Sequence, residues 1–202
     1  MRLGIRLSIP ALLALLACAH ADLRAQGYYA FVTYNTGLPT SSMASFVGGY
    51  SFTGIGLDAG LLLGRRLSAG ATIGWNVFDE DTDGVLTFDN GAISGTQSRF
   101  VNIAPVMATA RYDLKTGGGM RPYLGLGLGL YFVDRISEFG QFRFQDKNWH
   151  LGVAPQLGFT FPLGSGITGF ADARYNRAFA AGPDNRSYSY LGINFGLGFR
   201  YR

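Results

Sequence analysis

The acidic run DEDTDG, from Asp79 to Gly84, combines residue types and a spacing that could bind a divalent cation. Carboxylates at alternate positions, followed by a glycine, match the opening of a calcium-binding loop, so Asp79, Asp81 and Asp83 are its candidate ligands. The twelfth position of such a loop requires a bidentate glutamate, and this chain has Asn90 there. The run therefore predicts either a calcium loop that lacks one ligand or a solvated loop that binds no metal.

His150 is the only histidine beyond the first 25 residues, and an imidazole can act as a general base. A serine two positions along the same strand face would complete a hydrolytic pair, but Gly152 stands there. A serine from another strand remains an alternative. We therefore predict no catalytic residue and expect His150 to face the interior of the fold near one rim.

The stretch RPYLGLGLGLYF alternates four leucines with three glycines, Gly125, Gly127 and Gly129. Glycines cradle a phosphate when a strand, a glycine loop and a helix follow one another. Here the chain continues as Leu-Tyr-Phe-Val, without a helical period. We interpret the stretch as a strand and expect no nucleotide or other cofactor. Its glycines would leave space for long side chains of other strands, for which Arg174 and Arg200 are the candidates.

Six charged residues stand at alternate positions of segments that are otherwise apolar or small: Asp58, Arg111, Asp113, Asp172, Arg174 and Arg200. Alternate residues of a strand lie on one face, so these side chains are expected opposite the apolar face. Charges that are buried have to be paired. The pattern therefore predicts an Asp–Arg network inside the fold, packed beside glycines.

A period of two along the chain defines the elements that would position these groups. Eight strands are predicted, near 28–36, 51–63, 67–78, 99–113, 121–133, 147–162, 167–178 and 188–201. Tight turns alternate with longer segments, which are predicted at 37–50, 79–98, 134–146 and 179–187. This alternation indicates an antiparallel up-and-down meander with both termini at the end of the short turns. Pro105 interrupts the fourth strand and predicts a β-bulge there.

One face of these strands is almost unbroken Leu, Ile, Phe and Ala, whereas the other carries Gly, Asn, Asp and Arg. An apolar outer band around a polar and small interior is typical of a membrane barrel, in which closure of the sheet pairs every backbone polar group. The predicted fold class is all-β, an eight-stranded antiparallel up-and-down transmembrane β-barrel. A secreted soluble barrel remains the alternative. Aromatic residues near the strand ends are expected to form interfacial girdles: Tyr112, Tyr123, Trp149, Phe161, Phe199 and Tyr201.

The N-terminus has the order of a secretory signal peptide, with a basic start, a mostly apolar run over Leu7–Ala17 and small residues after it. The apolar run is shorter than the roughly 20 residues that a membrane-spanning helix needs. We predict a signal peptide over 1–25, cleaved after Ala21 or Ala25, and a barrel domain over 26–202. The net charge of +4 is partly in this predicted signal, and no stripe of Lys and Arg indicates a nucleic-acid partner.

The last predicted strand ends in NFGLGFRY, which has a polar residue, a glycine and two aromatic residues at fixed spacing: Asn194, Gly196, Phe199 and Tyr201. This motif resembles the C-terminal assembly signal of bacterial outer-membrane barrels, although Arg202 follows the final aromatic residue. With the signal peptide and the eight strands, the chain resembles the small outer-membrane β-barrel domain family, the OmpA-, OmpX- and OmpW-like proteins. Residues 38–54 and 74–78 resemble a branch of it in which a short helix is expected near 41–47.

The resemblance implies an integral protein of the Gram-negative outer membrane that contacts lipid and lipopolysaccharide, is inserted by the outer-membrane assembly machinery and is a monomer. Because the interior of an eight-stranded barrel is just wide enough for side chains, the Asp–Arg network is expected to plug it. We therefore predict a non-enzymatic structural or surface-interaction role. The alternatives are a narrow porin-like channel or transporter for small or apolar solutes, and a lipid A-modifying enzyme.

Overall fold

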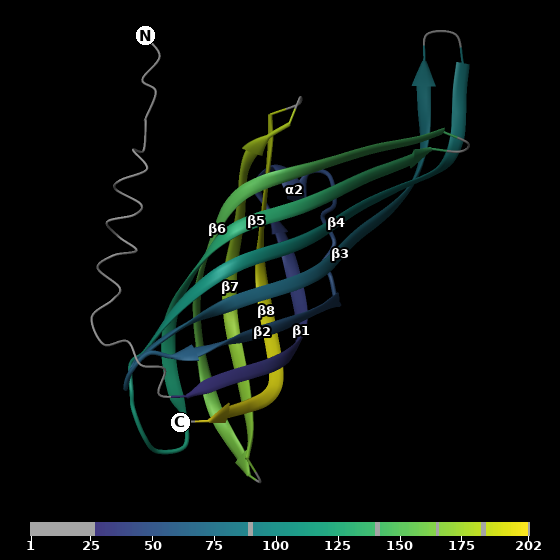
Figure 1. Cartoon of the computed structure of the whole chain (residues 1–202). Helices are drawn as coiled ribbons and strands as arrows, with labels where there is room; N and C mark the ends of the chain where they lie inside the picture. Colours follow the sequence, from purple (N-terminus) through teal and green to yellow (C-terminus); the bar gives the residue numbers. More distant parts are fainter. Residues whose placement is uncertain (1–26, 89–90, 140–141, 165, 183–184, 202) are drawn as a thin grey trace, which may run out of the picture.

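The computed structural model describes residues 27–88, 91–139, 142–164, 166–182 and 185–201, and in it eight antiparallel strands form one closed barrel (Figure 1). The strands are β1 (Tyr28–Thr40), β2 (Thr53–Leu62), β3 (Leu67–Phe88), β4 (Gly91–Asp113), β5 (Arg121–Phe139), β6 (Phe142–Gly164), β7 (Ile167–Ala181) and β8 (Arg186–Tyr201). The predicted fold class is confirmed. The predicted signal peptide, its cleavage sites and Arg202 lie outside the described residues.

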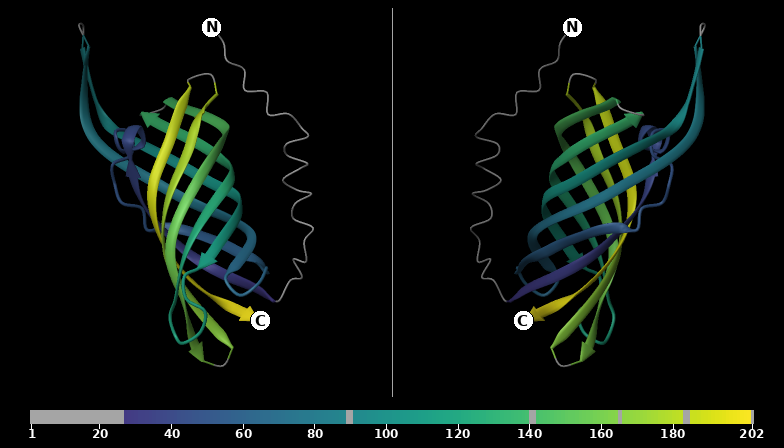
Figure 2. Two further views of the ribbon diagram at one scale, coloured as in Figure 1. Left: turned by 90° about the vertical axis from the view of Figure 1, so that its left-hand side faces the viewer. Right: turned by 90° about the vertical axis from the view of Figure 1, so that its right-hand side faces the viewer.

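The barrel has two unlike ends (Figure 2). Three tight turns, together with the start of β1 and the end of β8, form the short-turn end. The long-loop end carries the helix α2 (Ser41–Ala44), which lies inside the range where the resemblance implied one, and the β3–β4 hairpin, which extends beyond the other strands. No helix in the described parts of the chain is long and apolar enough to span a membrane.

The strands at the long-loop end are longer than the sequence pattern predicted. In the segment 79–98, predicted as a loop, residues 79–88 belong to β3 and residues 91–98 to β4, and Asp79 pairs with Phe100 while Asp83 pairs with Thr96. Residues 134–139 and 142–146 likewise extend β5 and β6. The prediction was wrong here because backbone ladders continue beyond the point where one face stops being apolar, and the period of two is then lost from the sequence.

The wall of the barrel is uneven around β1. This strand pairs with β8 from Tyr28 to Thr40 but with β2 only from Tyr28 to Tyr34, because β2 is short. The chain between α2 and β2 lies beside the remaining part of β1, where Gly37 and Ser51 exchange backbone hydrogen bonds of 2.9 and 2.8 Å. This segment therefore takes the place of a neighbouring strand along the upper part of β1.

The predicted bulge at Pro105 is absent. Ile73 pairs with Val106 and Asn76 pairs with Ile103, so two residues intervene on each strand and the register does not shift. The proline has no N–H to donate, and the ladder between β3 and β4 is interrupted there without an extra residue. The ring faces inward against Gly74, where an added Cβ would lie 3.2 Å from it.

Apolar side chains cover the outside of the barrel, as the alternation predicted. Leu124, Leu126, Leu128 and Leu130 of the glycine-rich stretch are all exposed on this face. The girdle residues Tyr112, Trp149, Phe199 and Tyr201 also point outward, and Phe161 is half-buried. Tyr123 was predicted to join them, but its side chain is 1% exposed and lies inside the barrel. Its position in β5 has the parity of the inward-facing glycines, which overrides its place near a strand end.

Glycines inside the barrel seat aromatic rings of other strands. An added Cβ at Gly196 would overlap the ring of Phe170, one at Gly158 would meet Tyr123, and one at Gly152 would meet Tyr131. The same holds for Gly37 with the ring of Phe78, and Gly60 and Gly70 lie against the hydroxyl group of Tyr29. The close approach of backbone and ring requires residues without a side chain at these positions.

The space beside the glycines of β5 is filled by residues other than the two predicted arginines. Gly125 faces Gln156, Gly127 faces Met107 and Ala154, and Gly129 lies against the backbone of Val106 and Met107. The expectation that these glycines accommodate Arg174 and Arg200 was wrong, because the strands next to β5 supply the neighbouring side chains.

Candidate functional site

A layer of paired charges crosses the interior of the barrel, and we call Asp58, Arg111, Asp172 and Arg174 the charged layer. Arg111 donates a hydrogen bond to Asp58, and Arg174 Nη2 lies 3.7 Å from Asp58 Oδ2 and 3.2 Å from Asp172 Oδ2. All four side chains are at most 8% exposed. Three strands, β2, β4 and β7, thus converge on one set of ion pairs.

Neutral groups complete the hydrogen bonds of the charged layer. Thr72 donates to Asp58 over 3.1 Å, Tyr123 donates to Asp172 over 3.0 Å, and Asn194 donates to the same carboxylate over 2.6 Å. The guanidinium of Arg111 also lies between aromatic rings, 5.3 Å from the centre of Tyr29 and 5.1 Å from that of Tyr123. Buried charges that are paired and hydrogen-bonded in this way hold a fixed arrangement.

A second ion pair, between Asp113 and Arg200, lies near the ends of β4 and β8 at the short-turn end. The structure therefore places all six sequence-predicted charges inside the barrel, but in two groups. The four residues of the predicted assembly signal divide between the two faces of β8. Asn194 and Gly196 face inward, whereas Phe199 and Tyr201 are exposed on the outside beside Tyr28.

An apolar layer fills the interior on the long-loop side of the charged layer, and the sequence did not predict it. Its buried members are Met43, Val47, Phe78, Val101, Ile103, Met107, Tyr131, Val133, Ala154, Ala178, Tyr188 and Tyr190. Met43, in α2, is 2% exposed, and Val47, in the segment after α2, is 0% exposed; both side chains pack into this layer. The parity of Arg111 continued back along β4 passes through Met107, Ile103 and Val101, so alternation could have revealed this layer.

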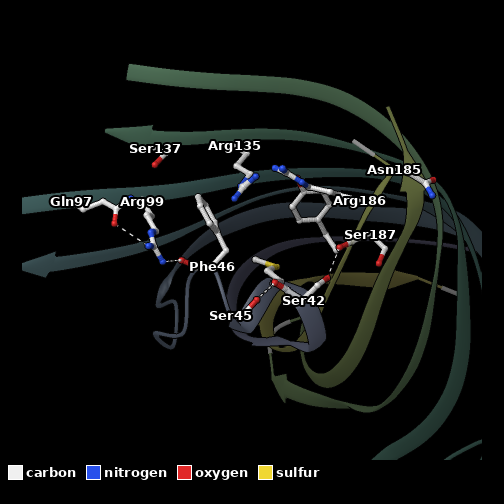
Figure 3. Close-up of a pocket in the computed structure, with 12 residues that line it drawn as sticks. Ser42, Ser45, Phe46, Gln97, Arg99, Arg135, Ser137, Asn185, Arg186 and Ser187 are labelled. Atoms are coloured by element: carbon white, nitrogen blue, oxygen red, sulfur yellow. Dashed lines mark hydrogen bonds between the residues drawn. The ribbon is translucent and has the colours of Figure 1, made fainter. Parts of the chain in front are cut away.

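Above the apolar layer lies a cavity of about 720 Å³ at the long-loop end, which we call the mouth pocket (Figure 3). It is lined by Ser42, Met43, Ser45, Phe46, Gln97, Arg99, Arg135, Ser137, Asn185, Arg186, Ser187 and Tyr188. Three arginines and no carboxylate are among these side chains. Met43 and Tyr188 belong to the apolar layer as well, so this layer forms the floor of the pocket.

Phe46 holds two of the arginines of the mouth pocket. The guanidinium carbon of Arg135 lies 3.6 Å from the centre of the Phe46 ring, and that of Arg99 lies 5.4 Å from it. Arg99 also donates to the backbone oxygen of Phe46 over 3.4 Å and to Gln97 over 2.9 Å. Figure 3 shows the ring standing between the two arginines, with Arg186 beside Arg135.

The candidate calcium residues lie on an extended strand, not in a loop. Asp79, Asp81 and Asp83 alternate along β3, and the side chains of Asp79 and Asp81 are exposed. Residues two apart on a strand are separated by almost 7 Å along the chain, which spreads carboxylates instead of wrapping them around an ion. Among the described residues, no three His, Cys, Asp or Glu side chains are grouped to hold a metal.

His150 is buried on the inward face of β6, with 1% of its surface exposed. Its Nδ1 lies 2.9 Å from the backbone oxygen of Phe179, and its ring lies edge-on to Tyr188 at 5.2 Å. The other nitrogen, Nε2, has no hydrogen-bond partner within the described part of the chain. In the described structure, no serine is therefore hydrogen-bonded to this ring as a nucleophile would be.

Comparison with known proteins gives a family and a fold. The family described as "Outer membrane protein beta-barrel domain" matches residues 8–202. Neisserial surface protein A (NspA) has a similar structure, with a TM-score of 0.53, 17% identity and coverage of 88% of this chain and 97% of that one. No curated protein matches the sequence.

Two further solved structures are similar over most of their length. Ail of Yersinia pestis has a TM-score of 0.49 and 12% identity, covering 87% of this chain and 99% of its own. OprG of Pseudomonas aeruginosa has a TM-score of 0.47 and 13% identity, covering 89% and 98%.

Proposed function

This chain belongs to the outer membrane protein β-barrel domain family and is an integral protein of the outer membrane, and on that premise we propose that it is a non-enzymatic barrel with a closed lumen that acts at the cell surface. In barrels of this kind the short turns lie in the periplasm and the longer connections outside the cell. The long-loop end, with α2 and the mouth pocket, would then face the outside of the cell.

The observation that carries this proposal is the charged layer. The guanidinium of Arg111 lies among the rings of Tyr29, Tyr123 and Phe170, and it is also paired with Asp58. An eight-stranded barrel leaves an interior that side chains can fill completely. A paired network at one level, with the apolar layer above it, supports a lumen that is closed to ions.

Conductance of the purified protein in planar lipid bilayers tests the closed lumen. We expect the refolded wild-type chain to give no stable current steps, while a general porin measured in the same bilayers conducts. A preparation whose gel mobility changes on boiling shows that the barrel has folded before it is measured. Reproducible current steps from the wild-type protein would refute the closed lumen.

A transporter for small apolar solutes is the second candidate, and the apolar layer favours it. Met43, Val47 and Phe78 could contact an apolar solute that enters from the long-loop end. Uptake of a radiolabelled alkane into liposomes with the protein, compared with liposomes without it, separates this role from the first. Uptake above the protein-free background would favour the transporter.

The partners proposed for this protein follow from the family and from β8. The outward side chains of Phe199 and Tyr201 at the end of the last strand are available to the outer-membrane assembly machinery. The apolar outer face would contact lipid, and the rim of the long-loop end would contact lipopolysaccharide. A lipid A-modifying activity is the least supported role, because no serine is hydrogen-bonded to His150 in the described structure.

A further inference from the structure

The mouth pocket gathers positive charge on the inner wall of the barrel. Arg99, Arg135 and Arg186 come from β4, β5 and β8, and their side chains line one cavity in which none of the described lining residues is acidic. Arg135 and Arg186 also line a smaller adjoining cavity of about 370 Å³, where Asp146 is the one acidic residue among the described lining residues. The like charges of Arg99 and Arg135 repel each other, and an anion beside them would relieve this repulsion.

The two acidic residues nearest to these arginines in the ladders are engaged elsewhere. Glu80 lies opposite Arg99 in the backbone register of β3 and β4, but its carboxylate accepts a hydrogen bond from the backbone N–H of Gly48. Asp146 lies opposite Arg135 in the backbone register of β5 and β6, but its carboxylate accepts a hydrogen bond of 2.7 Å from Asn148. Among the side chains that the structure describes, no carboxylate lies within 4 Å of a nitrogen of either arginine.

The arginines are also held in place before any ligand arrives. Arg135 lies on the ring of Phe46, and Arg99 is fixed by the Phe46 carbonyl and by Gln97. The Nε of Arg99 is buried and has no hydrogen-bond partner in the described part of the chain. A site whose donors are already ordered loses less conformational entropy on binding.

We propose that the mouth pocket binds a phosphate ester carried on a sugar, with Arg99 and Arg135 as the main ligands. Planar guanidinium groups bind phosphate oxygens through two parallel hydrogen bonds. The hydroxyl-bearing serines of the pocket and Asn185 surround the arginines and would contact a polar sugar. This assignment deepens the proposed surface role and rests on it, because the pocket has to open to the outside of the cell.

The size of the cavity indicates more than a free phosphate ion. A volume of about 720 Å³ lies within the range of about 300–1,000 Å³ that small-molecule sites occupy. The phosphate can come from a soluble phosphorylated sugar or from the phosphorylated sugar headgroup of a lipid in the outer leaflet. Both present the same chemistry to the arginines, and the experiment distinguishes them.

Calorimetry of the full-length mature protein in nanodiscs tests the site with two probes. The soluble probe is fructose 1,6-bisphosphate, titrated against fructose as the uncharged control. The lipid probe is a nanodisc that contains lipid A with both phosphates, compared with one that contains dephosphorylated lipid A. We expect binding to at least one phosphorylated probe and at least tenfold weaker binding in Arg135→Ala and in Arg99→Ala.

Arg143→Ala is the matched control, because Arg143 lies at the same end of the barrel but pairs with Glu138, 3.4 Å away, and does not line the pocket. Its affinity should equal that of the wild type, and all variants should keep the heat-dependent gel shift of a folded barrel. Binding of the soluble probe alone or of the lipid alone supports the site and identifies the source of the phosphate.

Two outcomes overturn the site: no binding of either phosphorylated probe to the folded wild-type protein, or the same loss of affinity in Arg143→Ala as in Arg135→Ala. Both are independent of conductance, so a barrel that conducts ions yet binds phosphate through Arg135 would refute the closed lumen and leave the site intact.

Discussion

Removal of the Asp58 carboxylate is the sharpest test of the charged layer. This side chain is 0% exposed and is the carboxylate on which Arg111 and Arg174 both converge. Across the 3.7 Å between Arg174 Nη2 and Asp58 Oδ2, Coulomb's law with an effective dielectric constant of about 20 gives an attraction of about 4 kcal/mol. Arg174 keeps Asp172 when Asp58 is lost, whereas Arg111 keeps no ion-pair partner among the described residues.

Much of this attraction offsets the cost of desolvating the charges. The loss of unfolding free energy in an Asp58 variant therefore reflects the cost of leaving the buried Arg111 without its ion-pair partner. We expect Asp58→Ala to lower the free energy of unfolding by about 3–5 kcal/mol. The double variant with Arg111→Met removes both charges and should recover most of that loss. Asp79→Ala removes an exposed carboxylate of β3 and should change stability by less than about 0.5 kcal/mol.

Urea unfolding of the protein refolded into lipid vesicles measures these differences. The fluorescence of Trp75 and Trp149, which are exposed on the outer face, follows their transfer from lipid to water. Gel mobility without boiling reports the folded fraction independently. The reasoning fails if Asp58→Ala unfolds within 1 kcal/mol of the wild type, or if the double variant is no more stable than the single one.

Two further substitutions test the two faces of the wall by the same unfolding assay. Gly196→Ala should cost about 1–3 kcal/mol, because its Cβ would overlap the Phe170 ring, whereas Gly119→Ala, where a Cβ meets nothing within 4 Å, should be almost neutral; equal effects would contradict the seating of rings on glycine. Leu128→Arg should cost about 2–4 kcal/mol at its outward position in β5, and Leu114→Arg, in the turn after β4, about 0–1; no difference between them would contradict a lipid-facing position for Leu128.

The sequence predicted the fold because period two persists through most of the wall. Leu124 to Leu130 alternate with glycines, and the parity of that stretch decides which side chains face lipid. The same parity, read without regard to strand ends, would have placed Tyr123 inside. Where the alternation of apolar residues ends in the sequence, after Phe78, the pattern is lost, and β3 and β4 continue through backbone pairing.

The candidate site was less predictable, because it depends on partners far apart in the chain. The six inward charges could be assigned to a face one strand at a time, but the choice of Asp58 as the partner of Arg111 depends on the curvature of the closed sheet. The mouth pocket was missed because Arg99 was the first residue of a predicted strand and Arg135 lay in a predicted loop. Both arginines have the parity of the inward-facing residues of their strands, Arg99 on β4 and Arg135 on β5, so continuing the alternation past the apolar layer would have placed them inside.

The meander topology also fixes the order in which the barrel can assemble. Seven of its ladders join strands that follow one another in the chain, so each can form as a local hairpin at a small cost in loop-closure entropy. The ladder between β1 and β8 joins residues 28–40 to residues 189–201, and nearly the whole chain lies between them. Formation of this ladder is therefore the step that closes the barrel. Until Tyr28 meets Tyr201, the molecule is an open sheet with two unpaired edges, and those edges are where a folding catalyst has to protect it.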